Sequence, residues 1–114
     1  MIDFTKAIAL NPNLAKAYNE RGIAYSYKCN YKQAVADHTK AIAINPNYVK
    51  AYINRGSAYS ILGSYMQAIA DFTKAIELNP NNPTAYRNRG RVYICLGNIQ
   101  QGEADFEKAE KLRM

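Results

Sequence analysis

The sequence predicts an all-α protein, an α-solenoid built from antiparallel helix hairpins. Two observations predict this fold: a repeat of 34 residues, and helical spacing of the apolar residues within each repeat. The repeat is marked by a tyrosine, a glycine and a second tyrosine that recur in the same order, as Tyr18, Gly22 and Tyr25, then Tyr52, Gly56 and Tyr59, then Tyr86, Gly90 and Tyr93. Aligning residues 15–48 with 49–82 leaves 20 of 34 positions identical. Self-similarity at such a period is typical of stacked helical repeats.

The repeat divides the single domain, residues 1–114, into a half unit and three units. Residues 1–14 match the second half of a unit, and the three units are 15–48, 49–82 and 83–114. Within a unit, residues such as Tyr52, Gly56 and Tyr59 share one helix stripe, and a second stripe follows after Gly63. Because neither helix can bury its stripe alone, neighbouring hairpins are expected to stack into one continuous core.

Turn residues support the same division. Gly63 and Gly97 are expected to end first helices in the left-handed conformation, and Cys29 occupies the equivalent position. The second helices are expected to end at an asparagine followed by proline, which gives Asn11, Asn45 and Asn79. The first helices are expected to be capped by Asn13, Asn47 and Asn82, with Pro83 at the first helical position.

Most tyrosines and the single histidine are expected in the core. His38 takes the place held by Phe4, Phe72 and Phe106, so we interpret it as a packing residue. Tyr27 and Tyr48 break the pattern and are expected on the surface. The tyrosines assigned to the core are Tyr18, Tyr25, Tyr31, Tyr52, Tyr59, Tyr65, Tyr86 and Tyr93.

Composition restricts the class of protein. Hydrophobic residues make up 48% of the chain without a long apolar run, which favours a soluble protein that does not enter a membrane. The two cysteines occupy non-equivalent repeat positions, so a disulfide is not expected and a reducing compartment, the cytoplasm, is. The net charge of +6 favours acidic partners, either an acidic peptide or a nucleic acid.

The motif of each unit resembles the tetratricopeptide repeat (TPR) family. The family pattern of aromatic, small and aromatic residues in the first helix, then Ala, aromatic, Ala and Pro, is matched by Tyr52, Gly56, Tyr59, Ala68, Phe72, Ala75 and Pro80. The resemblance implies a right-handed superhelix that acts as a non-catalytic protein-interaction scaffold, with partner peptides in a concave groove lined by the first helices. The chain departs from the family at Arg21, Arg55 and Arg89, where leucine or isoleucine is usual.

An arginine on the packing face needs a partner, because an unpaired charge there carries a desolvation penalty. Aspartates recur at the same period on the second helices. We therefore predict an interior ladder in which each carboxylate meets the arginine of the following unit, joining Asp3 to Arg21, Asp37 to Arg55 and Asp71 to Arg89. The alternative is that these are solvated charges on an outer face.

Groove residues follow from the same resemblance, and they are the positions that vary between units. An acidic, extended segment is the preferred ligand because cations dominate these positions. Two alternatives give a similar pattern: sequence drift on a face without a ligand, and charged residues that serve only to keep the protein soluble. The predicted groove residues are Lys16, Asn19, Glu20, Ile23, Ser26 and Tyr27 in the first unit, Lys50, Ile53, Asn54, Ser57 and Ile61 in the second, and Thr84, Arg87, Asn88, Arg91, Ile94 and Cys95 in the third.

Several other functions are disfavoured. No catalytic constellation, metal-ligand spacing or phosphate loop is found, so we predict no enzyme, no metal and no cofactor. TPR domains that bind chaperone C-terminal tails use Lys and Asn in the first helix, Asn in the next, and Lys and Arg in the third. The corresponding positions here are Asn19, Ile23, Asn54, Thr84 and Asn88. Only Asn54 agrees, so such tails are disfavoured. Nucleic-acid binding is the runner-up, and it is weakened because most tyrosines are assigned to the interior.

A third hypothesis is self-association through the terminal helices. The opening helix lacks a first-helix partner, and its apolar side, Phe4, Ile8 and Leu10, would be partly bare. At the other end, Gly102 stands where Ala34 and Ala68 stand and is expected to loosen the last helix.

Overall fold

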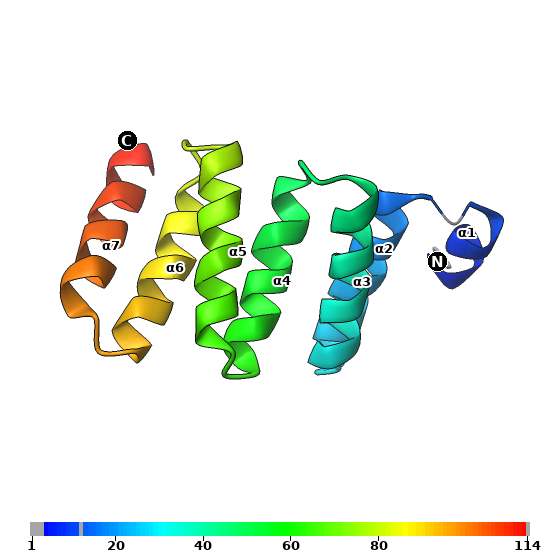
Figure 1. Ribbon diagram of the computed structural model, residues 1–114, viewed down its shortest axis with the longest axis horizontal. Helices are drawn as coiled ribbons and strands as arrows, with labels where there is room; N and C mark the ends of the chain where they lie inside the picture. The colour runs from blue at the N-terminus through cyan, green and yellow to red at the C-terminus, as the bar shows by residue number, and fades with distance from the viewer. Residues whose placement is uncertain (1–3, 12, 114) are drawn as a thin grey trace.

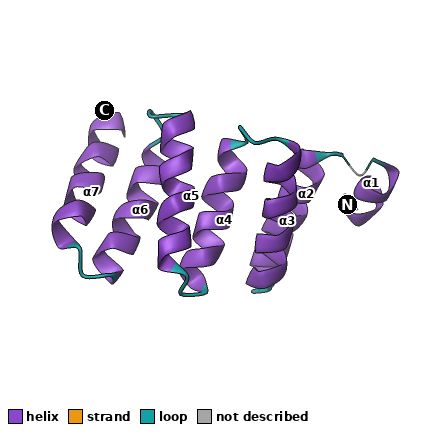
Figure 2. Ribbon diagram, in the orientation of Figure 1, coloured by secondary structure: helices purple, strands orange, loops and turns teal. Residues whose placement is uncertain are grey.

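The computed structural model describes residues 4–11 and 13–113. Helices joined by short loops account for the described chain, and no strand occurs within it (Figure 2). The predicted all-α class is therefore confirmed. In chain order the helices are α1 (Phe4–Leu10), α2 (Ala15–Tyr27), α3 (Tyr31–Ile44), α4 (Val49–Ile61), α5 (Tyr65–Leu78), α6 (Pro83–Cys95) and α7 (Ile99–Arg113).

The helices pair into antiparallel hairpins, α2 with α3, α4 with α5 and α6 with α7, that stand side by side in one row (Figure 1). The hairpin turns lie along one edge of the row, at the bottom of this view, and α1 stands at its N-terminal end. Neighbouring hairpins are in contact, so the predicted stacking is confirmed. The resulting body is elongated, with extents of 47 × 26 × 24 Å.

The hairpin turns depend on one residue of positive φ in each unit. Gly63 has φ 81° and Gly97 has φ 84°, as expected of glycines that end a helix. Cys29 holds the same position with φ 62°, whereas the next residue, Asn30, has an ordinary φ of −92°. The first unit therefore places a side chain in the conformation that the other two units give to glycine.

The second helices end where the sequence predicts. Asn45 and Asn79 are the C-cap residues of α3 and α5, with φ of −130° and −145°, and a proline follows each. A residue before proline is driven out of the helical region, which explains this stop.

Two of the three predicted N-caps are wrong. The N-cap residues of α2 and α4 are Leu14 and Tyr48, one position after Asn13 and Asn47. Only Asn82 caps as expected: its side chain accepts a hydrogen bond of 3.0 Å from the backbone N–H of Thr84, and Pro83 opens α6.

The repeat register explains the error. Asn13 and Asn47 are equivalent to Asn81, not to Asn82. The backbone N–H groups of these three residues donate to side chains of the asparagines two positions earlier, at 3.2 Å each. They are thus turn residues that precede the cap.

The centre of each hairpin is built from small residues and one ring. Ala34, Ala41, Ala68 and Ala75 are fully buried, as is Phe72. A Cβ on Gly56 would lie 2.7 Å from Cε1 of Phe72, which explains why this position of α4 is glycine.

The tyrosines only partly follow the prediction of a core role. Tyr52 is buried, but the other seven assigned to the interior are half-buried. Tyr27 is 86% exposed as expected, whereas Tyr48 is half-buried. The half-buried rings of the first helices lie beside the repeated arginines Arg21, Arg55 and Arg89. They therefore shield one side of each guanidinium from solvent.

The predicted ladder between units is wrong in its register. Arg55 pairs with Asp71 of its own unit instead of Asp37, and Arg89 pairs with Asp105 instead of Asp71. The remaining predicted pair involves Asp3, which lies outside the described residues.

Hairpin geometry gives the reason. Arg21 and Asp37 are equally far in sequence from the turn residue Cys29, so an antiparallel hairpin sets them level with each other, and Nε and Nη2 of Arg21 donate to the carboxylate at 2.7 Å each. The same symmetry holds around Gly63 and Gly97.

The last hairpin closes more tightly than we expected. Gly102 on α7 packs against Gly90 on α6: a Cβ on Gly102 would lie 2.9 Å from the carbonyl oxygen of Gly90. Gly102 therefore permits close approach of two backbones, in addition to its low helix propensity.

Candidate ligand-binding face

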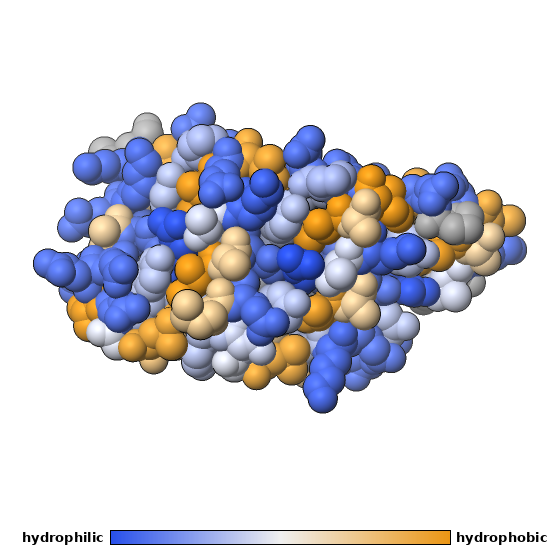
Figure 3. Space-filling model, in the orientation of Figure 1, coloured by the Kyte–Doolittle hydropathy of each residue, from blue (hydrophilic) through white to orange (hydrophobic). Residues whose placement is uncertain are grey.

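Two equivalent cavities lie along the first helices α2, α4 and α6. We call the surface that lines these cavities the groove face. Over the view in Figure 3, hydrophilic and hydrophobic side chains are interspersed, so the surface drawn there does not present one continuous apolar patch.

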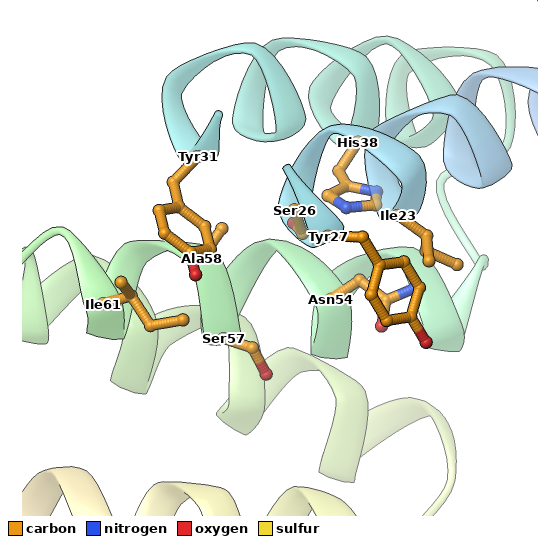
Figure 4. Close-up of a pocket in the computed structure, with 9 residues that line it drawn as sticks. All are labelled: Ile23, Ser26, Tyr27, Tyr31, His38, Asn54, Ser57, Ala58 and Ile61. Atoms are coloured by element: carbon orange, nitrogen blue, oxygen red, sulfur yellow. The ribbon is translucent and has the colours of Figure 1, made fainter. Parts of the chain in front are cut away.

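The first cavity lies between the first and second units and measures about 250 Å³. Figure 4 shows His38, Ser26, Ile23 and Tyr27 near one end, and Tyr31, Ala58 and Ile61 toward the other. Its lining residues are Ile23, Ser26, Tyr27, Tyr31, His38, Asn54, Ser57, Ala58 and Ile61. The lining is mainly apolar, and its polar groups are the hydroxyls of two serines and two tyrosines, an amide and an imidazole.

The second cavity is the same site one repeat further along. It measures about 200 Å³ and is lined by Ser57, Ser60, Ile61, Phe72, Asn88 and Arg91. Each of these residues lies 34 positions after a lining residue of the first cavity. The repeat therefore creates two equivalent cavities whose chemistry differs: His38 is replaced by Phe72, and Ser57 by Arg91.

His38 is the most unusual group of the first cavity. Its side chain is 0% exposed and packs against Gly22 as Phe72 packs against Gly56, so its interpretation as a packing residue is confirmed. Unlike phenylalanine, it carries two ring nitrogens, and neither has a hydrogen-bond partner within the described protein.

The protonation state of His38 follows from its surroundings. Burial lowers the pKa of His38 from 6.5 to about 4; the Asp37 carboxylate opposes this shift and the Arg55 guanidinium adds to it. The imidazole is therefore neutral at pH 7 and offers one hydrogen-bond donor and one acceptor.

Most of the predicted groove residues divide into three groups. The first group lines the cavities, and its members in the first cavity are Ile23, Ser26, Tyr27, Asn54, Ser57 and Ile61. Ser57 and Ile61 also line the second cavity, together with Asn88 and Arg91 of α6. These residues come from successive first helices, as the repeat predicts.

A second group lies beneath the surface. Asn19 is only 3% exposed, and Ile53 belongs to the hydrophobic core. The Asn54 amide nitrogen donates to Oδ1 of Asn19 at 3.3 Å, and the Asn19 amide nitrogen lies 3.5 Å from the Tyr48 hydroxyl. Asn19 thus holds Asn54 in place and is not itself open to a ligand.

The third group is cationic and lies outside the two cavities. Lys16 is 3.9 Å from Glu20, one turn along α2, so its charge is partly compensated. Lys50 is exposed and Arg87 is half-buried. Neither these two nor Arg91 has an ion-pair partner among the described residues.

Some residues that line the first cavity were not predicted from the sequence. Tyr31 and His38 come from the second helix α3, where helical spacing assigned them to the interior, and Ala58 was not singled out. The substitution of histidine for phenylalanine within the repeat was the one available signal for His38.

Two negative findings concern the described residues. No helix among them is both long and apolar enough to cross a bilayer. Within the same residues, histidine, cysteine, aspartate and glutamate side chains form no group of three or more that could hold a metal ion.

A row of antiparallel helix hairpins with repeated cavities on its first helices defines a helical-repeat solenoid. Family models described as tetratricopeptide repeat match residues 15–48 and 49–82, and another match covers residues 72–104. The chain belongs to the tetratricopeptide repeat family. This family generally provides non-catalytic scaffolds for protein interactions.

Solved structures of TPR proteins are closely similar. A crystal structure of MamA matches with a TM-score of 0.92 and 28% identity over 96% of this chain, which spans 64% of that chain. The second TPR of Spaghetti (RPAP3) bound to HSP90 peptide SRMEEVD matches with a TM-score of 0.85 and 28% identity, covering 91% of this chain and 97% of that chain.

The Arabidopsis OM64 TPR domain matches with a TM-score of 0.85 and 32% identity, covering 86% of this chain and 81% of that chain. A comparison with curated protein sequences found no match. The similarities establish the fold and the interaction-scaffold class, and they do not identify a ligand for this chain.

Proposed function

We propose that this chain is a non-catalytic scaffold that binds an extended peptide with acidic side chains along the groove face. The observation that carries the proposal is the pair of equivalent cavities, one repeat apart, on successive first helices. Repetition of a cavity suits a ligand that is itself extended, because successive side chains can enter successive sites.

Charge supports an acidic ligand. Lys50, Arg87 and Arg91 lie on α4 and α6 without ion-pair partners among the described residues, whereas the one acidic groove residue, Glu20, is near Lys16. Free cations beside apolar cavities favour carboxylates in a partner and increase its association rate. The net charge of +6 acts in the same direction.

Two similar structures are titled as TPRs of Spaghetti (RPAP3) bound to the HSP90 peptide SRMEEVD, which is itself acidic. For this chain we propose recognition of acidic side chains and not of a terminal carboxylate. At the positions used for that carboxylate, Ile23 and Thr84 carry no charge and Asn54 already donates to Asn19. The charge-assisted hydrogen bonds that fix a carboxylate are therefore missing there.

Isothermal titration with SRMEEVD, its C-terminally amidated form and SRMQQVN tests the proposal. We expect the first two peptides to bind alike, since the terminal carboxylate is not recognised. The third peptide, which has no acidic side chain, should bind much more weakly. Lys50→Glu plus Arg87→Glu should weaken binding of SRMEEVD about tenfold, because two attractive contacts become repulsive.

Lys40→Glu plus Lys74→Glu is the matched control. These lysines are exposed on the second helices α3 and α5, so this variant makes the same change in net charge away from the groove face. Equal effects of the two double variants, or no difference between SRMEEVD and SRMQQVN, would contradict the proposal.

A further inference from the structure

A third cavity extends the groove face toward the N-terminal end of the row, between α1 and α2 (Figure 1). We call it the terminal cavity. It measures about 250 Å³ and is lined by Phe4, Glu20, Ile23, Ala24 and Tyr27. Each of these residues has a counterpart 34 positions later in the lining of the first cavity, namely His38, Asn54, Ser57, Ala58 and Ile61. The groove face therefore carries three equivalent cavities in a row.

The chemistry of equivalent lining positions changes in one direction along this row. From the terminal cavity to the second cavity, one position reads Glu20, Asn54 and Asn88, and another reads Ile23, Ser57 and Arg91. A carboxylate and an aliphatic group thus lie at the α1 end, and an amide and a guanidinium at the α6 end. A ligand that spans the row meets an apolar environment at one end and a cationic one at the other.

The terminal cavity suits an aliphatic side chain. Four of its five lining residues provide carbon surface, and the charged one, Glu20, lies 3.9 Å from Lys16. A carboxylate of the ligand would be repelled by Glu20 and would lose its hydration, whereas an aliphatic group gains from burial. The volume is smaller than that of sites for drug-sized ligands, so one side chain is the fitting occupant.

The second cavity suits acidic side chains. Arg91 lines it, and Arg87 lies one helical turn earlier on α6. Like charges one turn apart destabilise a helix, and neither arginine has an ion-pair partner among the described residues. The Asn88 amide adds a hydrogen-bond donor to the lining. Carboxylates of a ligand would supply the missing compensation.

One extended peptide can reach both ends. Ile23 and Tyr27 line the terminal cavity and the first cavity alike, so a peptide in the first cavity continues directly into the terminal one. α2 contacts α4, and α4 contacts α6. Because axes of packed helices lie about 8–10 Å apart, the terminal and second cavities are about 16–20 Å apart. An extended chain covers this span with about six residues.

We propose that the groove face recognises a peptide with a fixed order of side chains: an aliphatic residue in the terminal cavity, and acidic residues about six positions away beside Arg91 at the second cavity. This inference rests on the proposed function, because it assigns an order of side chains to the same acidic peptide.

Isothermal titration with the acetylated and amidated peptides LTSTSTEE and ATSTSTEE tests the order. The reversed pair, EETSTSTL and EETSTSTA, is included because the cavities do not define the chain direction. In at least one direction we expect the wild-type protein to bind the leucine peptide about fivefold more tightly than the alanine peptide, the effect of partly burying the additional carbons. Shortened peptides, LTEE and ATEE in both directions, should bind alike, since leucine and the glutamates cannot reach their sites together.

Ala24→Leu assigns the leucine preference to the terminal cavity. Its new side chain would occupy this cavity, so the preference should disappear while binding of the alanine peptide is retained. Ala36→Leu is the matched control, since it makes the same change on the exposed surface of α3 and should keep the preference. Arg91→Gln should weaken binding of both peptides by the same factor. Circular dichroism checks that each variant is folded.

A peptide-free measurement separates this inference from the proposed function. N-acetyl-leucinamide carries the aliphatic side chain without a charge, and N-acetylglycinamide lacks that side chain. We expect the first compound, and not the second, to shift the backbone amide NMR signals of Glu20 and Ala24. This measurement decides where no peptide binds: a selective shift then supports the aliphatic subsite although the acidic-peptide proposal fails, and no shift overturns both.

Where the peptides do bind, their ratios decide. Equal binding of the leucine and alanine peptides in both directions would overturn the aliphatic subsite while leaving acidic-peptide binding intact. A leucine preference that persists in Ala24→Leu would also overturn it, because leucine would then bind elsewhere. A preference of the same size for LTEE over ATEE would overturn the proposed spacing.

Discussion

Arg55 on α4 donates two hydrogen bonds to Asp71 on α5, from Nε at 2.8 Å and from Nη2 at 2.7 Å. Its guanidinium carbon lies 5.9 Å from the Tyr52 ring centre and 5.7 Å from that of Tyr59. Nη1 donates to Thr39 of the preceding unit at 3.2 Å. One side chain thus joins both helices of its hairpin and the neighbouring hairpin.

The same arrangement recurs in the other units around Arg21 and Arg89. In each case the hydrogen bond to the aspartate raises the pKa of the guanidinium, and this outweighs the opposing effect of burial. The departure from leucine or isoleucine at this position is therefore compensated within every unit.

Arg55→Leu should lower the free energy of unfolding by about 3 kcal/mol, because it leaves the Asp71 carboxylate buried without its partner. Adding Asp71→Leu should recover most of this loss, since an apolar pair needs no charge compensation. Urea unfolding of the two single variants and the double variant measures the coupling. Additive losses would show that the two side chains stabilise the fold independently.

Gly102→Ala should destabilise the protein by about 1 kcal/mol, although alanine has the higher helix propensity. The new Cβ would lie 2.9 Å from the Gly90 carbonyl oxygen and 2.6 Å from Cδ1 of Ile94. Ile94 can move but the backbone cannot, so combining the change with Ile94→Ala should not restore stability. Thermal unfolding checks this, and a higher melting temperature for Gly102→Ala would contradict it.

Much of the fold could be predicted because it is set by local signals that repeat. Gly63 and the Asn79-Pro80 step each stop a helix by backbone preference alone, and the period multiplies such signals. The Arg55 partner could not be predicted from periodicity, because Asp37 and Asp71 fit the same period. Choosing between them required the hairpin geometry about the turn residue.

The groove face was predicted only in part for a related reason. Variation between units identified Ile23, Ser57 and Arg91, which do line the cavities. It gave no means to distinguish the buried Asn19 from its exposed neighbours on α2, because burial there depends on Tyr48 and Asn54 of the next unit. The lack of hydrogen-bond partners for the His38 nitrogens likewise depends on which residues several helices bring around the imidazole ring.

Cys29→Gly should raise the free energy of unfolding by a fraction of about 1 kcal/mol, because Cys29 has φ 62° and glycine removes the steric cost of that conformation. The glycine's added freedom in the unfolded chain offsets part of the gain. Asn30→Gly is the matched control: φ is −92° there, so it should only destabilise. Melting temperatures of the two variants and the wild-type protein test the prediction. A melting temperature of Cys29→Gly below that of the wild-type protein would contradict it.

His38→Phe tests the buried imidazole through stability alone. At pH 7 this variant should be more stable by about 1 kcal/mol or more, since it removes two unpartnered buried nitrogens and copies the packing of Phe72 against Gly56. Chemical unfolding at pH 7 measures the difference, and a marked loss of stability would show that the site does not accept phenylalanine.

The pH dependence of that difference gives the sharper result. The pKa of His38 is lowered from 6.5 to about 4 by burial, so between these values the unfolded chain binds a proton that the folded protein does not. Wild-type stability should therefore fall as the pH decreases from 6.5 to 4, by up to about 3 kcal/mol more than that of His38→Phe. The carboxylates are common to both proteins and cancel in the comparison. Parallel stability curves over this range would mean that His38 accepts its proton as readily in the folded protein as in the unfolded chain.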